Sequence, residues 1–163
     1  MKFQRDRLNV GVLTRLATSL YKALVFKISG QQEKLAWQKI LVADGLRIIG
    51  CCRLASRLAL SVHVAATTDK HRFWSTHAAG VALHYAGDLR GAERAFFQSQ
   101  GYANALQLSF SLQHLGKLNV ELGRYELAEQ QLKEALDIRH KLNKTDLASS
   151  TERALQGLRA LRA

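Results

Sequence analysis

Two segments of this 163-residue sequence repeat the same spacing of glycine, alanine and large apolar residues. The offset between them is 36 residues (116 − 80), and it holds at several pairs of positions. These pairs are Gly80 and Gly116, Gly87 and Gly123, Ala92 and Ala128, and Phe96 and Leu132. A repeat of this period is typical of chains built from stacked supersecondary units, each burying its apolar face against its neighbours. The repeat therefore limits residues 74–142 to a small set of folds.

The residue types of the repeat predict two hairpins of antiparallel helices. Two helices approach closely only where small side chains meet, so we expect Gly80 to lie against Ala92, with the corresponding pair meeting in the second segment. The corner of each hairpin needs a residue that tolerates a positive φ angle, which Gly87 and Gly123 provide. The large apolar residues of each segment then fill the space beside the crossing.

With these residues the sequence resembles the tetratricopeptide repeat family. The second segment matches the family pattern at Leu112, Leu115, Gly116, Gly123, Tyr125, Ala128, Leu132 and Ala135. The first segment matches at Gly80, Gly87, Leu89, Ala92 and Phe96. The chain departs from the family in its period, which is longer than the usual ~34 residues, and in the first-helix aromatic, replaced by Leu83 and Asn119. The resemblance implies an all-α fold, a right-handed α-solenoid of antiparallel helix hairpins.

The remaining sequence is also predicted to be helical. It contains no proline, which suits long helices joined by short turns. Apolar residues follow helical spacing over 8–26, and a long helical stretch is expected over 33–66, with a break near Asp44 and Gly45. We therefore expect two regions. Residues 1–70 form a basic N-terminal helical region, and residues 71–163 form two tetratricopeptide-like hairpins followed by a C-terminal capping helix.

A weaker third match precedes the two repeats. A shift of 77 residues (128 − 51) places Cys51 at the small-residue position of Ala128. Cys51 and Cys52 are adjacent, and helix neighbours point about 100° apart, so we expect two small core residues rather than a disulfide. An intracellular, reducing compartment is expected, the cytoplasm first. The basic segment 1–30 leaves organelle import as the alternative.

The net charge of +11 is concentrated in the first half of the chain. Residues 1–74 hold 13 Lys or Arg and 4 Asp or Glu, a balance of +9, whereas residues 75–163 hold 11 and 9, a balance of +2. Such an excess favours an acidic protein partner, nucleic acid or an anionic membrane surface, and it does not choose among them. The basic residues that would make this contact are Arg5, Arg7, Arg15, Lys22 and Lys27.

The family resemblance also implies a partner-binding face. Tetratricopeptide arrays bind an extended peptide or a helix on a concave face built from the first helix of each hairpin. By position, the resemblance nominates Trp74, His77, Val81, His84, Tyr85, Phe110, Gln113, Lys117, Val120 and Glu121. Trp and Tyr are enriched in binding hot spots, which favours this choice. The alternative is that Trp74 and Phe110 only pack against the preceding helix.

The sequence predicts a binding protein rather than an enzyme. It contains no phosphate-binding loop, no Gly-x-Ser-x-Gly and no His-Glu-x-x-His motif. His77 and His84 could share a helix face, but two ligands are too few for a structural zinc site, so neither a metal nor a cofactor is expected. The predicted function is protein–protein interaction, as an adaptor, assembly or regulatory factor. The alternative is a basic accessory subunit that binds nucleic acid or an anionic membrane surface within a larger complex.

Overall fold

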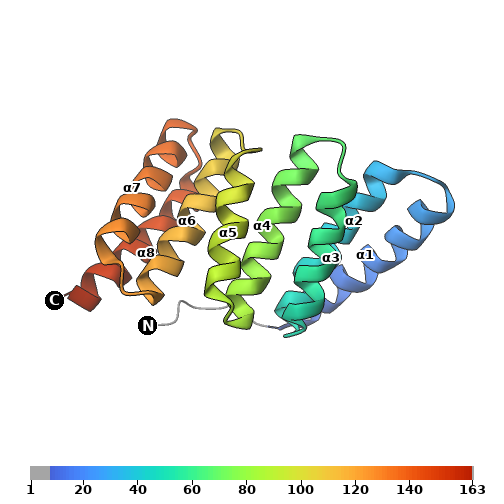
Figure 1. Cartoon of the computed structure of the whole chain (residues 1–163), viewed down its shortest axis with the longest axis horizontal. Helices are drawn as coiled ribbons and strands as arrows, with labels where there is room; N and C mark the ends of the chain where they lie inside the picture. The colour runs from blue at the N-terminus through green and yellow to red at the C-terminus, as the bar shows by residue number, and fades with distance from the viewer. Residues whose placement is uncertain (1–7, 163) are drawn as a thin grey trace. The chain divides into compact units, whose positions relative to one another are not determined.

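The computed structural model describes residues 8–162, and every regular element in this range is a helix. Figure 1 shows these helices, which are α1 (Val10–Ile28), α2 (Gln32–Ile48), α3 (Cys52–Ala65), α4 (Asp69–Ala86), α5 (Leu89–Gln100), α6 (Ala105–Glu121), α7 (Tyr125–Lys141) and α8 (Thr145–Arg162). The all-α prediction is confirmed for this part of the chain. No helix among the described residues is long and apolar enough to cross a membrane. The described residues divide into two compact units, 8–102 and 103–162.

The first unit, residues 8–102, contains α1 to α5. Each helix packs against the next one along the chain, and α2 also contacts α4 (Figure 1). Phe73 of α4 and Phe96 of α5 are both fully buried, and the ring of His77 contacts both of them. A cluster of small residues (Ala43, Ala59 and Ala79) joins α2, α3 and α4. The unit therefore combines aromatic packing at one pair of helices with close alanine packing at another.

The second unit, residues 103–162, contains α6, α7 and α8. Helix α7 packs against both α6 and α8, and α6 also contacts α8. Its apolar core is formed by side chains from all three helices, namely Val120, Ala128, Leu132, Ala154, Leu155 and Leu158. Helix α8 therefore packs on the apolar side of the α6–α7 pair, and its role as the cap of a repeat array stays a prediction.

The corners at Gly87 and Gly123 have the backbone conformation that the sequence predicts. Their φ angles are 85° and 73°, in the left-handed region. The amide after each glycine donates to a carbonyl of the preceding helix. Asp88 N donates to Leu83 O at 3.0 Å, and Arg124 N donates to Asn119 O at 2.9 Å. This pattern closes a helix C-terminus and starts the next helix within two residues. Asp88 then caps α5 by accepting a bond from the Gly91 amide at 2.9 Å.

The break predicted near Asp44 and Gly45 is wrong. Helix α2 continues through both residues to Ile48, and the chain turns at Gly50, whose φ angle is 94°. Gly45 serves a different purpose, because a Cβ atom there would lie 2.9 Å from Cδ1 of Leu16. Gly45 therefore lets α1 approach α2, and only Gly50 forms the corner.

The close contacts inside the two hairpins differ in detail from the expected pairs. A Cβ atom on Gly80 would lie 2.7 Å from Cε1 of Phe96, so Gly80 makes room for a ring rather than for Ala92. In α6, the nearest atoms to a Cβ on Gly116 belong mainly to Leu132. Because Phe96 and Leu132 lie one helical turn beyond the alanines, each glycine receives a large side chain from the partner helix.

Helices α2 and α3 form a third hairpin, with a different register from the predicted one. Its corner is Gly50, 37 residues before Gly87 (87 − 50), so its small-residue position falls at Ala55, which is fully buried. Cys51 lies at the corner and is exposed, and Cys52 is half-buried. The expectation that both cysteines lie in the core is therefore wrong, and so is the alignment of Cys51 with Ala128.

Candidate functional site

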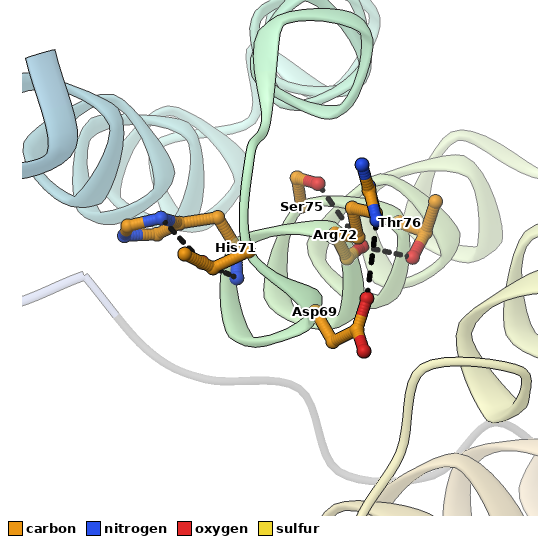
Figure 2. Close-up of polar contacts among 6 residues, drawn as sticks. Asp69, His71, Arg72, Ser75 and Thr76 are labelled. Carbon is orange, nitrogen blue, oxygen red and sulfur yellow. Dashed lines mark hydrogen bonds and ion pairs between the residues drawn. The ribbon is translucent and has the colours of Figure 1, made fainter.

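The first turn of α4 is fixed by a set of short-range polar contacts (Figure 2). The Thr68 hydroxyl caps the helix by accepting from the His71 amide at 3.3 Å, and the same oxygen lies 3.0 Å from His71 Nδ1. Arg72 donates to Asp69 at 3.2 Å, and the two side chains point toward one another in Figure 2. The Thr76 hydroxyl donates to the Arg72 carbonyl at 2.6 Å. These contacts fix the orientation of the first turn of α4, which carries His71 and leads into Trp74.

Trp74 belongs to a cluster of aromatic side chains between α2 and α4. Its ring meets Trp37 of α2 edge-to-face, with centroids 6.4 Å apart. Trp37 also contacts the ring of His71, at 6.4 Å. On the other side, the stacked Phe73 and His77 rings lie 5.4 Å apart in the core. Trp37 and Trp74 both remain partly exposed, so the cluster has a buried side and an accessible side.

A cleft of about 460 Å³ opens beside Trp37. It is lined by Phe26, Glu33, Lys34, Trp37, Gln38, Thr68, Lys70 and His71, and we call it the Trp37 cleft. Lys70 Nζ lies 5.0 Å from the Trp37 ring centroid, and Lys34 Nζ lies 5.6 Å from that of Phe26. Two cations and one carboxylate give the cleft a positive balance. It presents aromatic surface and ammonium groups together, from α1, α2 and the start of α4.

The residues nominated for the partner-binding face fall into two groups by burial. The buried ones are His77, Val81, His84, Gln113 and Val120. The partly exposed ones are Trp74, Tyr85, Phe110, Lys117 and Glu121. The residues 74–85 lie on α4 and the residues 110–121 on α6, in different compact units. That they form one face therefore stays a prediction.

Two of the partly exposed aromatic residues lie under arginine side chains. The Arg47 guanidinium lies 4.6 Å from the Tyr85 ring centroid, and Arg47 also bonds Asp44 at 2.7 Å. The Arg139 guanidinium lies 5.2 Å from the Phe110 ring centroid. Guanidinium groups favour the negative face of an aromatic ring, and this contact holds the ring in place. Each ring therefore has a structural contact in addition to any role in binding.

Arg139 of α7 is a buried cation that lies outside the set of residues nominated from the sequence. It is 1% exposed, and it donates to Ser109 Oγ at 3.1 Å, to the Leu147 carbonyl at 3.0 Å and to Thr151 Oγ1 at 2.5 Å. Its Nη1 also donates to Gln113 Oε1. Burial lowers the pKa of Arg139 to about 10, so the guanidinium stays charged at neutral pH.

The bonds of Arg139 reach all three helices of the second unit. Ser109 and Gln113 lie on α6, Arg139 itself on α7, and Leu147 and Thr151 on α8. Among the described residues, the partners of Arg139 are all neutral. The nominated residue Gln113 is thus part of a polar network inside the helix bundle. The only sequence signal for this network is the polar residues at helix positions that otherwise carry apolar side chains.

Three of the five nominated basic residues lie on α1, and all three are exposed: Arg15, Lys22 and Lys27. Arg5 and Arg7 lie outside the described residues. No protein-family model matches this chain, and no curated protein is significantly similar to it in sequence.

Proposed function

We infer that this chain is a protein-interaction module of the tetratricopeptide type, in which helix hairpins stack into a right-handed α-solenoid. The support is the recurrence of one corner geometry at Gly50, Gly87 and Gly123, spaced by 37 and 36 residues (87 − 50 and 123 − 87). A solenoid of this kind needs about three units before neighbouring faces are covered, and the α2–α3 hairpin supplies the third. Rigid hairpins present preformed side chains, which lowers the ordering cost of binding.

The observation that carries the binding proposal is the Trp37 cleft beside the Trp37–Trp74 pair. Tryptophan contributes large contact area at low conformational cost, and it is enriched in hot spots. Lys34 and Lys70 place two ammonium groups at the same cleft. The ligand that matches this chemistry is an acidic peptide segment carrying one large apolar side chain. The apolar side chain lies against Trp37, and the acidic groups pair with the two lysines.

The partly exposed residues of the nominated face extend this site along α4. Trp74 does not line the cleft but contacts Trp37, which does, and Tyr85 lies near the other end of α4. A peptide or helix bound along α4 would contact both. Residues of the second unit, such as Lys117 and Glu121, belong to the proposed face only if α4 and α6 present it together.

The test begins with selection of ligands from a displayed peptide library against the full chain. The dissociation constant of the selected peptides is then measured by fluorescence anisotropy. We expect acidic sequences with one aromatic or large aliphatic residue. Lys70→Glu should weaken binding about tenfold, because an attractive charge at the rim of the site becomes repulsive.

The matched control is Arg57→Glu, an exposed charge reversal on α3 away from the cleft. It should leave the dissociation constant unchanged. Trp74→Ala should weaken binding more than Lys70→Glu does, with folding checked by circular dichroism. If Lys70→Glu and Arg57→Glu weaken binding equally, the cleft is not the binding site. If the selected peptides show no acidic preference, the proposed ligand chemistry is wrong.

A further inference from the structure

Helix α1 has two apolar faces, and only one of them is covered. Val12 and Ser19 are buried where α1 packs on α2, and α2 is the only helix that α1 contacts within the described residues. The opposite side exposes Val10, Leu13, Leu20, Tyr21, Leu24 and Ile28, which we call the α1 apolar face. Leu20 and Tyr21 are adjacent and the other intervals are three, four or seven residues, so at about 100° per residue the six side chains fall within one sector of the helix and form one stripe along it.

The size of this stripe separates it from ordinary surface hydrophobic residues. Val10 and Ile28 are each 79% exposed, and the helix between them is about 28 Å long at ~1.5 Å per residue. Single exposed apolar residues are common, whereas a continuous apolar stripe marks a surface that contacts something else. The stripe therefore has an occupant in the working protein.

Charge on α1 identifies the chemistry of that occupant. The helix carries Arg15, Lys22 and Lys27 and not one Asp or Glu. All three cations are exposed, and none of them forms an ion pair within the described residues. At about 100° per residue, Lys27 borders the stripe next to Leu20, whereas Arg15 and Lys22 lie about 100° or more beyond Tyr21, toward α2. The exposed side of α1 thus carries positive charge at both of its borders with α2, and one cation lies directly beside the stripe.

We propose that the α1 apolar face lies on an anionic lipid surface. The apolar side chains enter the boundary between headgroups and acyl chains, Lys27 reaches lipid phosphates beside the stripe, and Arg15 and Lys22 add to the positive potential of the helix. Tyr21 suits this boundary because its ring is apolar and its hydroxyl is polar. The helix lies on the surface rather than spanning it, since its cations interrupt the apolar sequence and no described helix is long and apolar enough to cross.

Other occupants fit the same surface less well. A second copy of the chain would bring the cations of two α1 helices together with no acid between them. Nucleic acid would satisfy the cations and leave the apolar stripe in water. An anionic membrane satisfies both features at once. The Trp37 cleft takes no part in this contact, so the two binding proposals stand or fall separately.

The experiment is co-sedimentation of the full chain with phosphatidylcholine vesicles that contain or lack phosphatidylserine. We expect binding only when phosphatidylserine is present. Leu24→Ser combined with Ile28→Ser should reduce the partition coefficient at least tenfold, because two apolar side chains no longer enter the lipid. The matched control is Leu54→Ser with Val64→Ser on α3. These residues are 56% and 86% exposed, close to the 57% and 79% of Leu24 and Ile28.

A second pair of variants separates the α1 cations from general basicity. Replacing Arg15, Lys22 and Lys27 with glutamine should reduce partition about 100-fold, since each cation near an anionic surface contributes about fivefold. The control replaces three exposed arginines outside α1, namely Arg57, Arg90 and Arg94. This control should retain most of the binding. Circular dichroism checks that every variant keeps its helix content.

Several outcomes would overturn the proposal. Absence of binding to phosphatidylserine vesicles would do so, as would equal losses in the α1 variants and their controls. If vesicle binding is absent, light scattering could instead show a dimer. A dimer that is lost in the Leu24 and Ile28 variant would assign the stripe to a second copy of the chain. RNA binding that depends on the α1 cations but not on Leu24 and Ile28, again without vesicle binding, would assign the cations to nucleic acid.

Discussion

A Cβ atom on Gly116 of α6 would lie 2.6 Å from Cγ of Leu132 of α7. Gly116→Ala should therefore destabilise the chain by about 1–3 kcal/mol through overpacking. This result would oppose intrinsic helix propensity, which favours alanine over glycine by about 1 kcal/mol. The measurement is the free energy of unfolding from urea denaturation followed by circular dichroism.

Two variants make the Gly116 test specific. Gly101→Ala is the control, because the nearest atom to a Cβ there is 3.5 Å away, an ordinary contact. In a Leu132→Ala background, the cost of Gly116→Ala should fall, since the opposing side chain is gone. A cost that stays the same in both backgrounds would mean that Leu132 is not the obstacle.

Gly123 tests the backbone at a hairpin corner without any packing change. Its φ angle is 73°, and nothing lies within 4 Å of a Cβ built on it. Gly123→Ala should cost about 1–2 kcal/mol, because an L side chain is disfavoured in the left-handed region. Gly123→Asn should cost less, since asparagine tolerates that region better. Equal costs from urea denaturation of the two variants would contradict this explanation.

Arg139→Ala should cost about 2–4 kcal/mol, because it leaves buried acceptors such as Gln113 Oε1 without their charged donor. The free energy of unfolding again provides the measurement. Thr151→Val removes one acceptor and keeps the shape, so a loss of about 1 kcal/mol is expected. Lys141→Ala, an exposed change at the end of the same helix, should stay within about 0.5 kcal/mol of wild type. If Arg139→Ala is equally mild, the network contributes little.

Glu129 should make stability depend on pH in the acid range. A hydrogen bond and charge from Lys133, at 2.7 Å, hold the pKa of Glu129 below its ordinary value of 4.5, and Arg162 contributes at 3.1 Å. A carboxyl whose pKa is lowered on folding stabilises the protein above its unfolded pKa, and this contribution is lost as pH falls through the folded pKa. Glu129→Gln should therefore lower the Tm at pH 7, with the difference shrinking below pH 4.5.

Glu134→Gln is the control for this pH dependence, since it changes an exposed glutamate on the same helix. Its Tm should follow that of wild type across the whole range. A difference between wild type and Glu129→Gln that does not shrink at all as the pH falls through the acid range would show that the effect does not come from ionisation of Glu129.

The sequence predicts the corners at Gly87 and Gly123 because two repeats can be compared with one another. It fails at Gly45 and Gly50, where only one copy of the pattern is clear. Both a corner and a close helix contact require glycine, and the residue type alone does not tell a positive φ angle from a missing side chain. The structure separates them, with Leu16 against Gly45 and open space around Gly50.

The candidate site could be predicted only in part. Trp74 stands out as a large aromatic residue on the first helix of a repeat, but its contact with Trp37 depends on how α4 packs on α2. Arg139 could not be predicted, since an arginine near a helix end is usually solvated. Its side chain is buried because two other helices supply neutral hydrogen-bond acceptors. Ser109 and Gln113 lie on α6, and Thr151 lies on α8.

The positive φ angles of four glycines, Gly30, Gly50, Gly87 and Gly123, have a consequence for chemical synthesis. At these sites a D-alanine has the handedness that the backbone conformation favours. Each replacement restricts the unfolded chain and leaves the folded one unstrained, which stabilises by about 0.4–1 kcal/mol. The same corners that exclude ordinary L side chains are therefore places where mirror-image residues would strengthen the protein.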